Sequence, residues 1–183
     1  MDAAFEPFDT VLRDGRRVHV REIRPTDEEA ILQAFDRLAP GARYMRFMAT
    51  IKSPNVGRLR TVLASFPERG MSIAATVPGP EGIDIVGMSS FVLGHEPGSC
   101  EFAMAVLDEW GGAGLGRTLL GTLIDAARRR GLSVMHGFVL AENRPMLRLA
   151  ERLGFEIARD PEDFGVRVCR LRLDAPPAPR SAP

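Results

Sequence analysis

The chain has 183 residues, the length of a single domain with one well-buried core. It is 45% hydrophobic and 26% charged, an ordinary globular composition that argues against wholesale disorder. Its 24 basic and 24 acidic side chains give no net charge, which argues against bulk attraction to nucleic acid or to an anionic membrane.

The two ends differ from the middle of the chain. We expect an N-terminal extension over residues 1–16, one domain over residues 17–174 and a disordered, proline-rich tail over residues 175–183. The first residues carry neither the basic nor the apolar region of a signal peptide. The longest apolar run, 102–107, is too short to span a membrane.

Two cysteines, Cys100 and Cys169, are too few for a disulfide scaffold. We expect both to be small core residues in a reducing compartment, and therefore a cytoplasmic protein. The three histidines do not have the spacing of metal ligands, and no metal is expected. Nothing in the sequence indicates the oligomeric state.

The first third of the chain predicts one strand and three helices. Val18, Val20 and Ile23 indicate a strand that closes at Pro25, and Thr26 is placed as the N-cap of a helix with acidic residues in its first turn. That helix stops before residue 40. The following helices are expected over residues 42–48 and 56–64.

The remaining elements alternate between strands and helices, and no internal repeat is visible. A turn-forming stretch over 78–82 separates the first two strands and indicates a hairpin. The expected strands are 71–77, 83–93, 100–107, 134–140 and two more between 155 and 173; the expected helices are 114–130 and 145–153. This order predicts a mixed α/β fold.

The segment 101–118 carries the most informative pattern. A strand runs into a glycine-rich turn, which opens directly onto a long helix. Free N–H groups at a helix N-terminus bind phosphate, and glycines let a ligand approach the backbone. We predict an anion site here; the alternative is a tight turn that needs glycine only for its geometry.

Two nucleotide motifs fit this segment poorly. The dinucleotide fingerprint G-x-G-x-x-G would need a glycine at Arg117. The Walker A pattern has suitable spacing at Gly111, Gly116 and Thr118, but Arg117 replaces its lysine. No apolar strand that ends in aspartate follows to hold magnesium, so nucleotide hydrolysis is disfavoured.

The segment instead resembles the acetyl-CoA loop of the GNAT acyltransferases, R/Q-x-x-G-x-G/A. Gly114-Leu115-Gly116 matches the core of that motif, after a strand and before a helix. The stretch 143–155 resembles the second GNAT signature, an asparagine that opens a helix ending in L-G-F. The opening strand and acidic helix start, 20–27, are similar to the usual first elements of the family, and the resemblance spans about residues 18–173.

Within that family, segments 42–47 and 100–103 and the helix after Asn143, which lacks a tyrosine, resemble the Pat-type protein lysine acetyltransferases. The resemblance implies a GNAT fold, with a central twisted mixed β-sheet of about six or seven strands flanked by helices. It also implies an N-acetyltransferase that passes an acetyl group from acetyl-CoA directly to a primary amine. Some Pat relatives carry a further regulatory domain, for which this chain has no counterpart, so we expect any regulation to come from outside it.

The resemblance also implies which residues bind acetyl-CoA. Backbone groups of the strand should hold the pantetheine arm and polarise the thioester carbonyl, the glycine turn should take the pyrophosphate, and Asn143 should bond the pantetheine. For Asn143, a simple helix N-cap is the alternative. The implied binding residues are Met104, Ala105, Val106, Gly111, Gly112, Ala113, Gly114, Leu115, Gly116, Arg117, Thr118 and Asn143.

Glu101 is the candidate general base. On an extended strand it shares a face with Ala103 and Ala105, whose small side chains leave room for a ligand, while the alternate residues can pack the core. Burial would raise its pKa toward a useful range. The alternative is an edge-exposed or arginine-paired glutamate, and a bulge implied by the resemblance would shift the facing by one residue.

The sequence departs from the family pattern at two positions. Gly111 replaces the arginine or glutamine that opens the loop, and Ala150 occupies the position of the tyrosine that commonly protonates the leaving thiolate. Solvent, the substrate or another residue must supply that proton, and Tyr44 is a candidate.

Other titratable residues are weaker candidates for the base. Glu142 could serve as an alternative, whereas His136 is expected to be a buried core histidine and His95 a loop residue. The expected acceptor is a protein lysine. The alternatives are a small amine, an N-terminus, or a non-catalytic acyl-CoA sensor.

Overall fold

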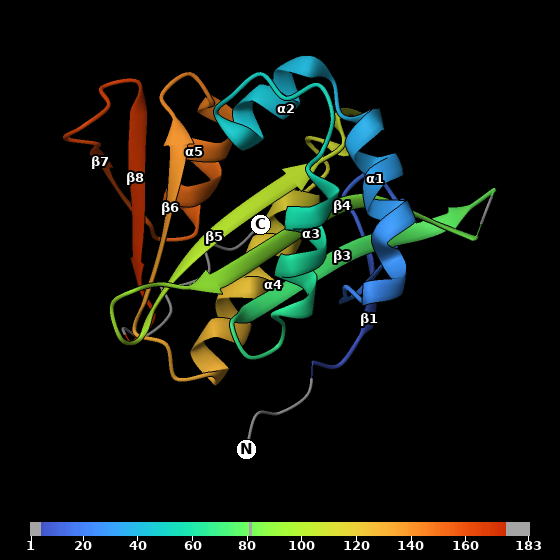
Figure 1. Cartoon of the computed structure of the whole chain (residues 1–183), viewed down its shortest axis with the longest axis horizontal. Helices are drawn as coiled ribbons and strands as arrows, with labels where there is room; N and C mark the ends of the chain where they lie inside the picture. Colours follow the sequence, from blue (N-terminus) through green and yellow to red (C-terminus); the bar gives the residue numbers. More distant parts are fainter. Residues whose placement is uncertain (1–4, 81, 175–183) are drawn as a thin grey trace.

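The computed structural model describes residues 5–80 and 82–174, which form one open, mixed sheet of eight strands (Figure 1). The expected tail over 175–183 lies outside the described residues. The strand order is β1-β2-β3-β4-β5-β6-β8-β7. The strands are β1 (Phe8–Val11), β2 (Arg17–Glu22), β3 (Gly70–Gly79), β4 (Gly82–Leu93), β5 (Ser99–Val106), β6 (Val134–Leu140), β7 (Glu156–Arg159) and β8 (Val166–Arg172).

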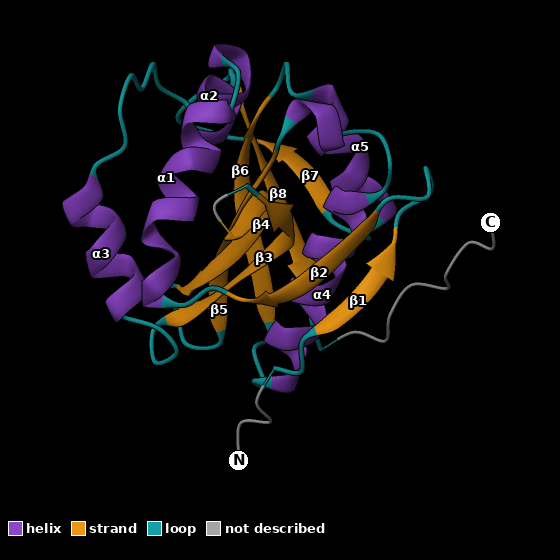
Figure 2. Cartoon of the chain, turned by 90° about the vertical axis from the view of Figure 1, so that its right-hand side faces the viewer, coloured by secondary structure: helices purple, strands orange, loops and turns teal. Residues whose placement is uncertain are grey.

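Helices cover both faces of the sheet (Figure 2). One layer holds α1 (Glu28–Arg37), α2 (Pro40–Phe47) and α3 (Val56–Ala64), and the other holds α4 (Leu115–Arg129) and α5 (Arg144–Arg152). The predicted mixed α/β architecture is confirmed. Among the described residues, no helix is both long enough and apolar enough to cross a membrane.

The eighth strand comes from a segment that we expected to be an extension. Residues Phe8–Val11 pair antiparallel with β2, in register from Phe8 opposite Val20 to Val11 opposite Arg17. This pairing adds an edge strand to the six or seven expected. Alternating hydrophobicity is weak over only four residues, so the sequence pattern did not reveal it.

Thr26 is not the N-cap that we expected. It lies in a 3-10 turn, η1 (Pro25–Asp27), and α1 begins after Asp27. The buried Asp27 carboxylate accepts two hydrogen bonds from Arg21, at 2.7 and 2.9 Å, and one from the backbone N–H of Arg24. Burial alone would raise the pKa of Asp27, but these bonds outweigh it and hold the pKa below its usual value.

Each face of the sheet has its own hydrophobic core. The α4 side contains most of the buried residues, including Leu119, Leu120 and Leu123 of α4. The α1–α3 side has a smaller cluster of five buried residues: Ile31, Ala34, Leu63, Ala74 and Ile85.

The sheet parts between β5 and β6, which are the only parallel pair among the described strands. Their ladder covers three residues, from Ser99 opposite Val134 to Glu101 opposite His136. Beyond this ladder, β5 stays paired with β4, regularly from Cys100 to Val106, whereas β6 stays paired with β8. A register shift lies between β3 and β4, whereas the described pairing of β5 with β4 is regular, so the side chains of β5 keep their alternate facing.

A phenylalanine ring fills the point at which the two strands part. A Cβ added to Gly137 on β6 would lie within 2.7 Å of Phe102 Cζ and closer still to another ring carbon. The same ring meets Phe155 edge-on, with centroids 5.2 Å apart. Gly137 therefore lacks a side chain because the Phe102 ring occupies that space.

We predict that Gly137→Ala lowers the free energy of unfolding by about 1–3 kcal/mol, the range for overpacking a core. Denaturant unfolding measures this. Gly121→Ala on α4 is the control: its added Cβ meets no atom within 4 Å, so this change should stabilise the protein slightly.

The double variant Gly137→Ala with Phe102→Leu should recover part of the loss, because the smaller side chain makes room. If Gly137→Ala behaves like Gly121→Ala, the contact does not constrain the fold.

Candidate active site

A cavity of about 2070 Å³ extends along the parting of β5 and β6. Its walls come from α1, α2 and α3 on one side and from the start of α4 and α5 on the other. Residues Met104, Ala105 and Val106 of β5, whose backbone we expect to bind acetyl-CoA, all line it. Since the β6 ladder ends at Glu101, this stretch of β5 has no β6 partner.

The glycine turn forms one end of the cavity. Eleven of the twelve predicted binding residues line it, and Leu115 does not. The Leu115 side chain is 1% exposed and packs in the α4 core, so only its backbone N–H is available, and the binding role expected of that N–H stays a prediction. The lining residues of this turn are Gly111, Gly112, Ala113, Gly114, Gly116, Arg117 and Thr118.

The N-terminus of α4 opens into this end of the cavity. Gly114 is the N-cap, with φ 98°, and no side chain caps the helix. The N–H groups of the first turn are therefore free to bind an anion, and the helix dipole favours negative charge there. A left-handed N-cap explains why glycine stands at this position.

Three elements converge at Gly116. A Cβ at that position would lie 3.2 Å from Leu149 Cδ2 on α5 and 3.4 Å from Met104 Cε on β5. Small residues on α4 therefore let the helix sit close to β5 and α5, where the cavity narrows.

Asn143 serves as the N-cap of α5. Its Oδ1 accepts a hydrogen bond from the backbone N–H of Met146, at 3.2 Å. The residue also lines the cavity. Asn143 is therefore a helix N-cap, and its bond to pantetheine, through the other atoms of the amide, stays a prediction.

Glu101 lies on the face of β5 turned toward the α1–α3 layer, opposite Phe102 in the core, as the alternation predicted. Its side chain is 55% exposed, so the expectation of a buried glutamate is wrong. The strand ends its pairing with β6 here, which opens the carboxylate to the cavity rather than to the core.

His136 stands directly across the ladder from Glu101. Its Nε2 lies 3.9 Å from Glu101 Oε2, and its side chain is 25% exposed. We expected a buried core histidine, and the structure corrects this. The pairing joins residues 35 positions apart, and no local sequence signal reports it.

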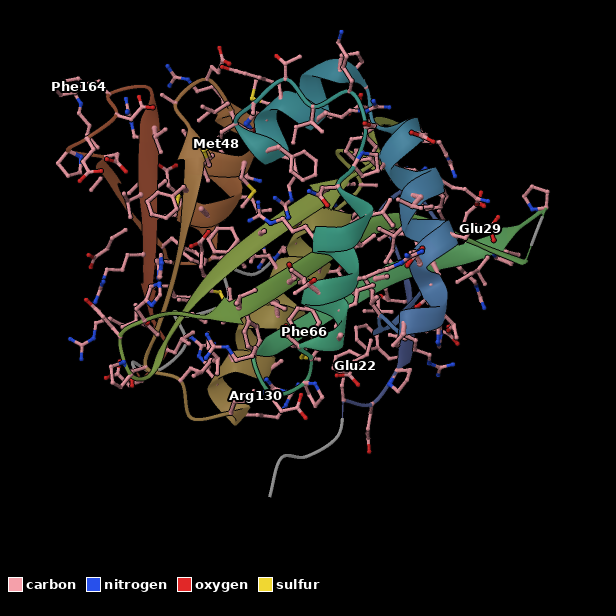
Figure 3. The ribbon with its side chains drawn as sticks, in the orientation of Figure 1. Glu22, Glu29, Met48, Phe66, Arg130 and Phe164 are labelled. Carbon is pink, nitrogen blue, oxygen red and sulfur yellow. The ribbon has the colours of Figure 1, made fainter. Side chains whose placement is uncertain are left out.

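Arg46 was missed by the sequence reasoning. This half-buried residue of α2 lines the cavity together with Arg58 and Glu101. Desolvation lowers the pKa of the Arg46 guanidinium, the Glu101 charge opposes that shift, and Arg58 adds to it. Figure 3 shows Met48, another cavity residue, at the end of α2 on the side of β6.

The remaining candidates separate by position. Tyr44 does not line this cavity; it lies on a separate hollow with Lys52, so it is not placed to protonate a leaving group. Ala150 is fully buried in the core. Glu142 and His95 are exposed residues on the cavity wall. Residues 5–80 and 82–174 contain no group of three or more metal-binding side chains.

Comparisons with known proteins agree with this geometry. A model of the Acetyltransferase (GNAT) family matches residues 41–155. Acetyltransferase PA5475 of Pseudomonas aeruginosa is 36% identical over 162 residues, which cover 88% of this chain and 87% of that protein.

Two solved structures share the fold. The GNAT domain of S. lividans PAT superposes with a TM-score of 0.82 at 25% identity, covering 91% of this chain and 96% of that domain. The yncA protein of Salmonella typhimurium, solved with its cofactor acetyl-CoA, has a TM-score of 0.68 at 25% identity, covering 90% and 99%.

We predict that Gly114→Asp weakens acetyl-CoA binding, because a carboxylate at the helix N-cap repels phosphate and competes for the N–H groups. Gly114→Asn adds a side chain of the same size without charge. Calorimetric titration should give a larger loss of affinity for the aspartate than for the asparagine, with equal melting temperatures.

Gly131→Asp is the matched control. Gly131 has φ 71° at the opposite end of α4 and does not line the cavity. The Gly131→Asp variant should therefore have the same affinity for acetyl-CoA as the unmodified protein. Unchanged affinity in Gly114→Asp would place the phosphate cradle elsewhere.

Proposed function

The chain belongs to the GNAT family of acetyltransferases and uses acetyl-CoA, and we propose that it acetylates protein lysine side chains with Glu101 as general base. The observation that carries the proposal is the placement of Glu101. Its carboxylate lies on the cavity wall where the pairing of β5 with β6 ends. It is on the same strand as the residues that we expect to hold the thioester. The likeness of segment 42–47 to Pat-type enzymes supports the lysine acceptor.

The acceptor amine must lose a proton before it can attack. A lysine amine with a pKa of about 10.4 is neutral in about one molecule in 2,500 at pH 7, which corresponds to about 4.6 kcal/mol. A positioned base removes part of that barrier. The exposed carboxylate of Glu101 can take this proton directly or through one water.

In the proposed reaction, acetyl-CoA supplies an activated acetyl thioester. The neutral amine nitrogen bonds to the carbonyl carbon, the carbon–sulfur bond breaks, and the sulfur leaves as a thiolate. The nitrogen gives up its second proton to solvent or to the sulfur, which leaves a neutral amide. Backbone N–H groups among Met104, Ala105 and Val106 would stabilise the developing negative charge on the carbonyl oxygen.

The thiolate does not require a dedicated acid. A thiol pKa of about 8.5 makes it a tolerable leaving group. Ala150 cannot donate a proton, and Tyr44 lies outside the cavity. We therefore propose that the sulfur is protonated by solvent or by the proton taken from the amine.

We predict that Glu101→Gln lowers kcat/KM for a lysine peptide at pH 7 by about 100-fold or more, the range for loss of a general base. The rate should recover as the pH rises toward the pKa of the amine, because hydroxide then supplies the neutral acceptor. Release of free CoA, followed over pH, measures this. Affinity for acetyl-CoA should change little.

The same pH series on Glu142→Gln discriminates between Glu101 and Glu142, two of the acidic residues that line the cavity. A loss confined to Glu142→Gln would move the base to that residue. Full activity of Glu101→Gln across the pH range would refute the assignment.

Arg46 favours a second candidate, acetylation of a small amine that carries a carboxylate. Arg46 and Arg58 line the cavity near the single carboxylate of Glu101, so this region has an excess of positive charge. A carboxylate on the acceptor would neutralise it, leaving the amine beside Glu101. Met48 and Ile51 of the same wall offer an apolar surface.

Leucine and its carboxamide test this second candidate, because they differ only in the carboxylate. We predict that the free acid is the better acceptor and that Arg46→Leu raises its KM by about tenfold or more while leaving the carboxamide unchanged. Equal rates for the two compounds, both slower than a lysine peptide, would favour the protein acceptor.

The compartment is also proposed as cytoplasmic. Cys100 and Cys169 are buried free thiols, and burial raises the pKa of Cys100 to about 12 and of Cys169 to about 11. Such thiols are inert core residues, which supports a reducing environment.

A further inference from the structure

The glycine turn that should receive the pyrophosphate contains no charged side chain. Residues 111–116 read Gly-Gly-Ala-Gly-Leu-Gly, so the position that opens the family motif with arginine or glutamine offers only backbone. The helix N-terminus supplies N–H groups and a partial positive charge. Arg117 follows in the first turn of α4, so a ligand with two linked phosphates has one side-chain cation from this segment and can use a second.

A cation reaches the turn from a distant part of the chain. Arg13 stands in the β1–β2 turn and lines the same cavity. Its Nη2 donates to the carbonyl oxygen of Gly112 at 2.7 Å, and its backbone N–H donates to the carbonyl oxygen of Ala113 at 3.1 Å. Its Nε lies 3.5 Å from the position that a Cβ of Gly114 would take.

Arg16 holds the β1–β2 turn in this place. Its guanidinium stacks on Trp110 at 4.0 Å from the ring centroid, and its Nη1 donates to the carbonyl oxygen of Glu109 at 2.9 Å. Asp14 forms an ion pair with Arg16, in which Asp14 Oδ2 lies 2.6 Å from Arg16 Nη2. These contacts tie the turn to the segment that precedes the glycine turn.

The charge of Arg13, in contrast, is not used within the protein. No carboxylate among the residues that the structure describes forms an ion pair with it, and it is exposed to the cavity. A guanidinium has five N–H donors. The bond to Gly112 leaves most of them free to bind a phosphate oxygen.

We propose that Arg13 binds a phosphate of acetyl-CoA and so replaces, from the β1–β2 turn, the side chain that the glycine turn lacks. The backbone hydrogen bond to Ala113 holds the β1–β2 turn in place, and the side-chain bond to Gly112 holds the guanidinium beside the N-terminus of α4. Cation and helix dipole then act on the same anion. This inference rests on the use of acetyl-CoA and not on the identity of the acceptor.

Calorimetric titration with CoA tests the proposal without any acceptor. Arg13→Gln keeps a side-chain donor for Gly112 but removes the charge, and it should weaken CoA binding about ten- to a hundredfold, the effect of one lost charge-assisted hydrogen bond. Arg13→Lys should recover part of that affinity. The salt dependence of binding should also be shallower in Arg13→Gln.

A ligand without phosphates shows whether Arg13 binds a phosphate directly or only supports the glycine turn. In the same titration with acetyl-pantetheine, Arg13→Gln and the unmodified protein should show the same affinity. The control is Arg17→Ala, on the exposed side of the same hairpin and outside the cavity lining, which should leave both ligands unaffected.

Two results would overturn the proposal. CoA affinity unchanged in Arg13→Gln would show that the charge touches no phosphate. Equal losses for CoA and acetyl-pantetheine would show that Arg13 only supports the turn.

Discussion

The site depends on the contact between Phe102 and Gly137, at the point where β5 and β6 part. The ring occupies the space of a β6 side chain directly after the last paired residues, Glu101 and His136. From there each strand follows a different neighbour. The parting leaves an edge of β5 without a strand partner inside the fold, and backbone groups in that position need a hydrogen-bonding ligand or water.

The two ends of the cavity carry different chemistry. At the α4 end, free helix N–H groups, Arg117 and Arg13 create a positive environment suited to phosphates. At the α2 end, Glu101 lies among Arg46 and His136. A ligand that is anionic at one end and reactive at the other would be oriented by charge before any specific contact forms.

Few side chains take part in the proposed chemistry. In the proposal, the strand backbone and the helix N-terminus hold the acetyl donor, and a single carboxylate prepares the acceptor. Because Ala150 is buried in the core rather than facing the cavity, a tyrosine there would need a rearrangement of α5 to reach a thiolate. The proposed reaction therefore relies on the low basicity of the leaving thiolate.

Local patterns in the sequence determined most elements, the glycine turn and the facing of Glu101, because periodicity and helix-start signals act over a few residues. Only the tertiary structure decided the rest. It turned Leu115 into the core, exposed Glu101, and brought Arg13, Arg46 and His136 to the cavity from other elements. These positions depend on strand pairing and helix packing between residues far apart in the chain, which no local pattern encodes.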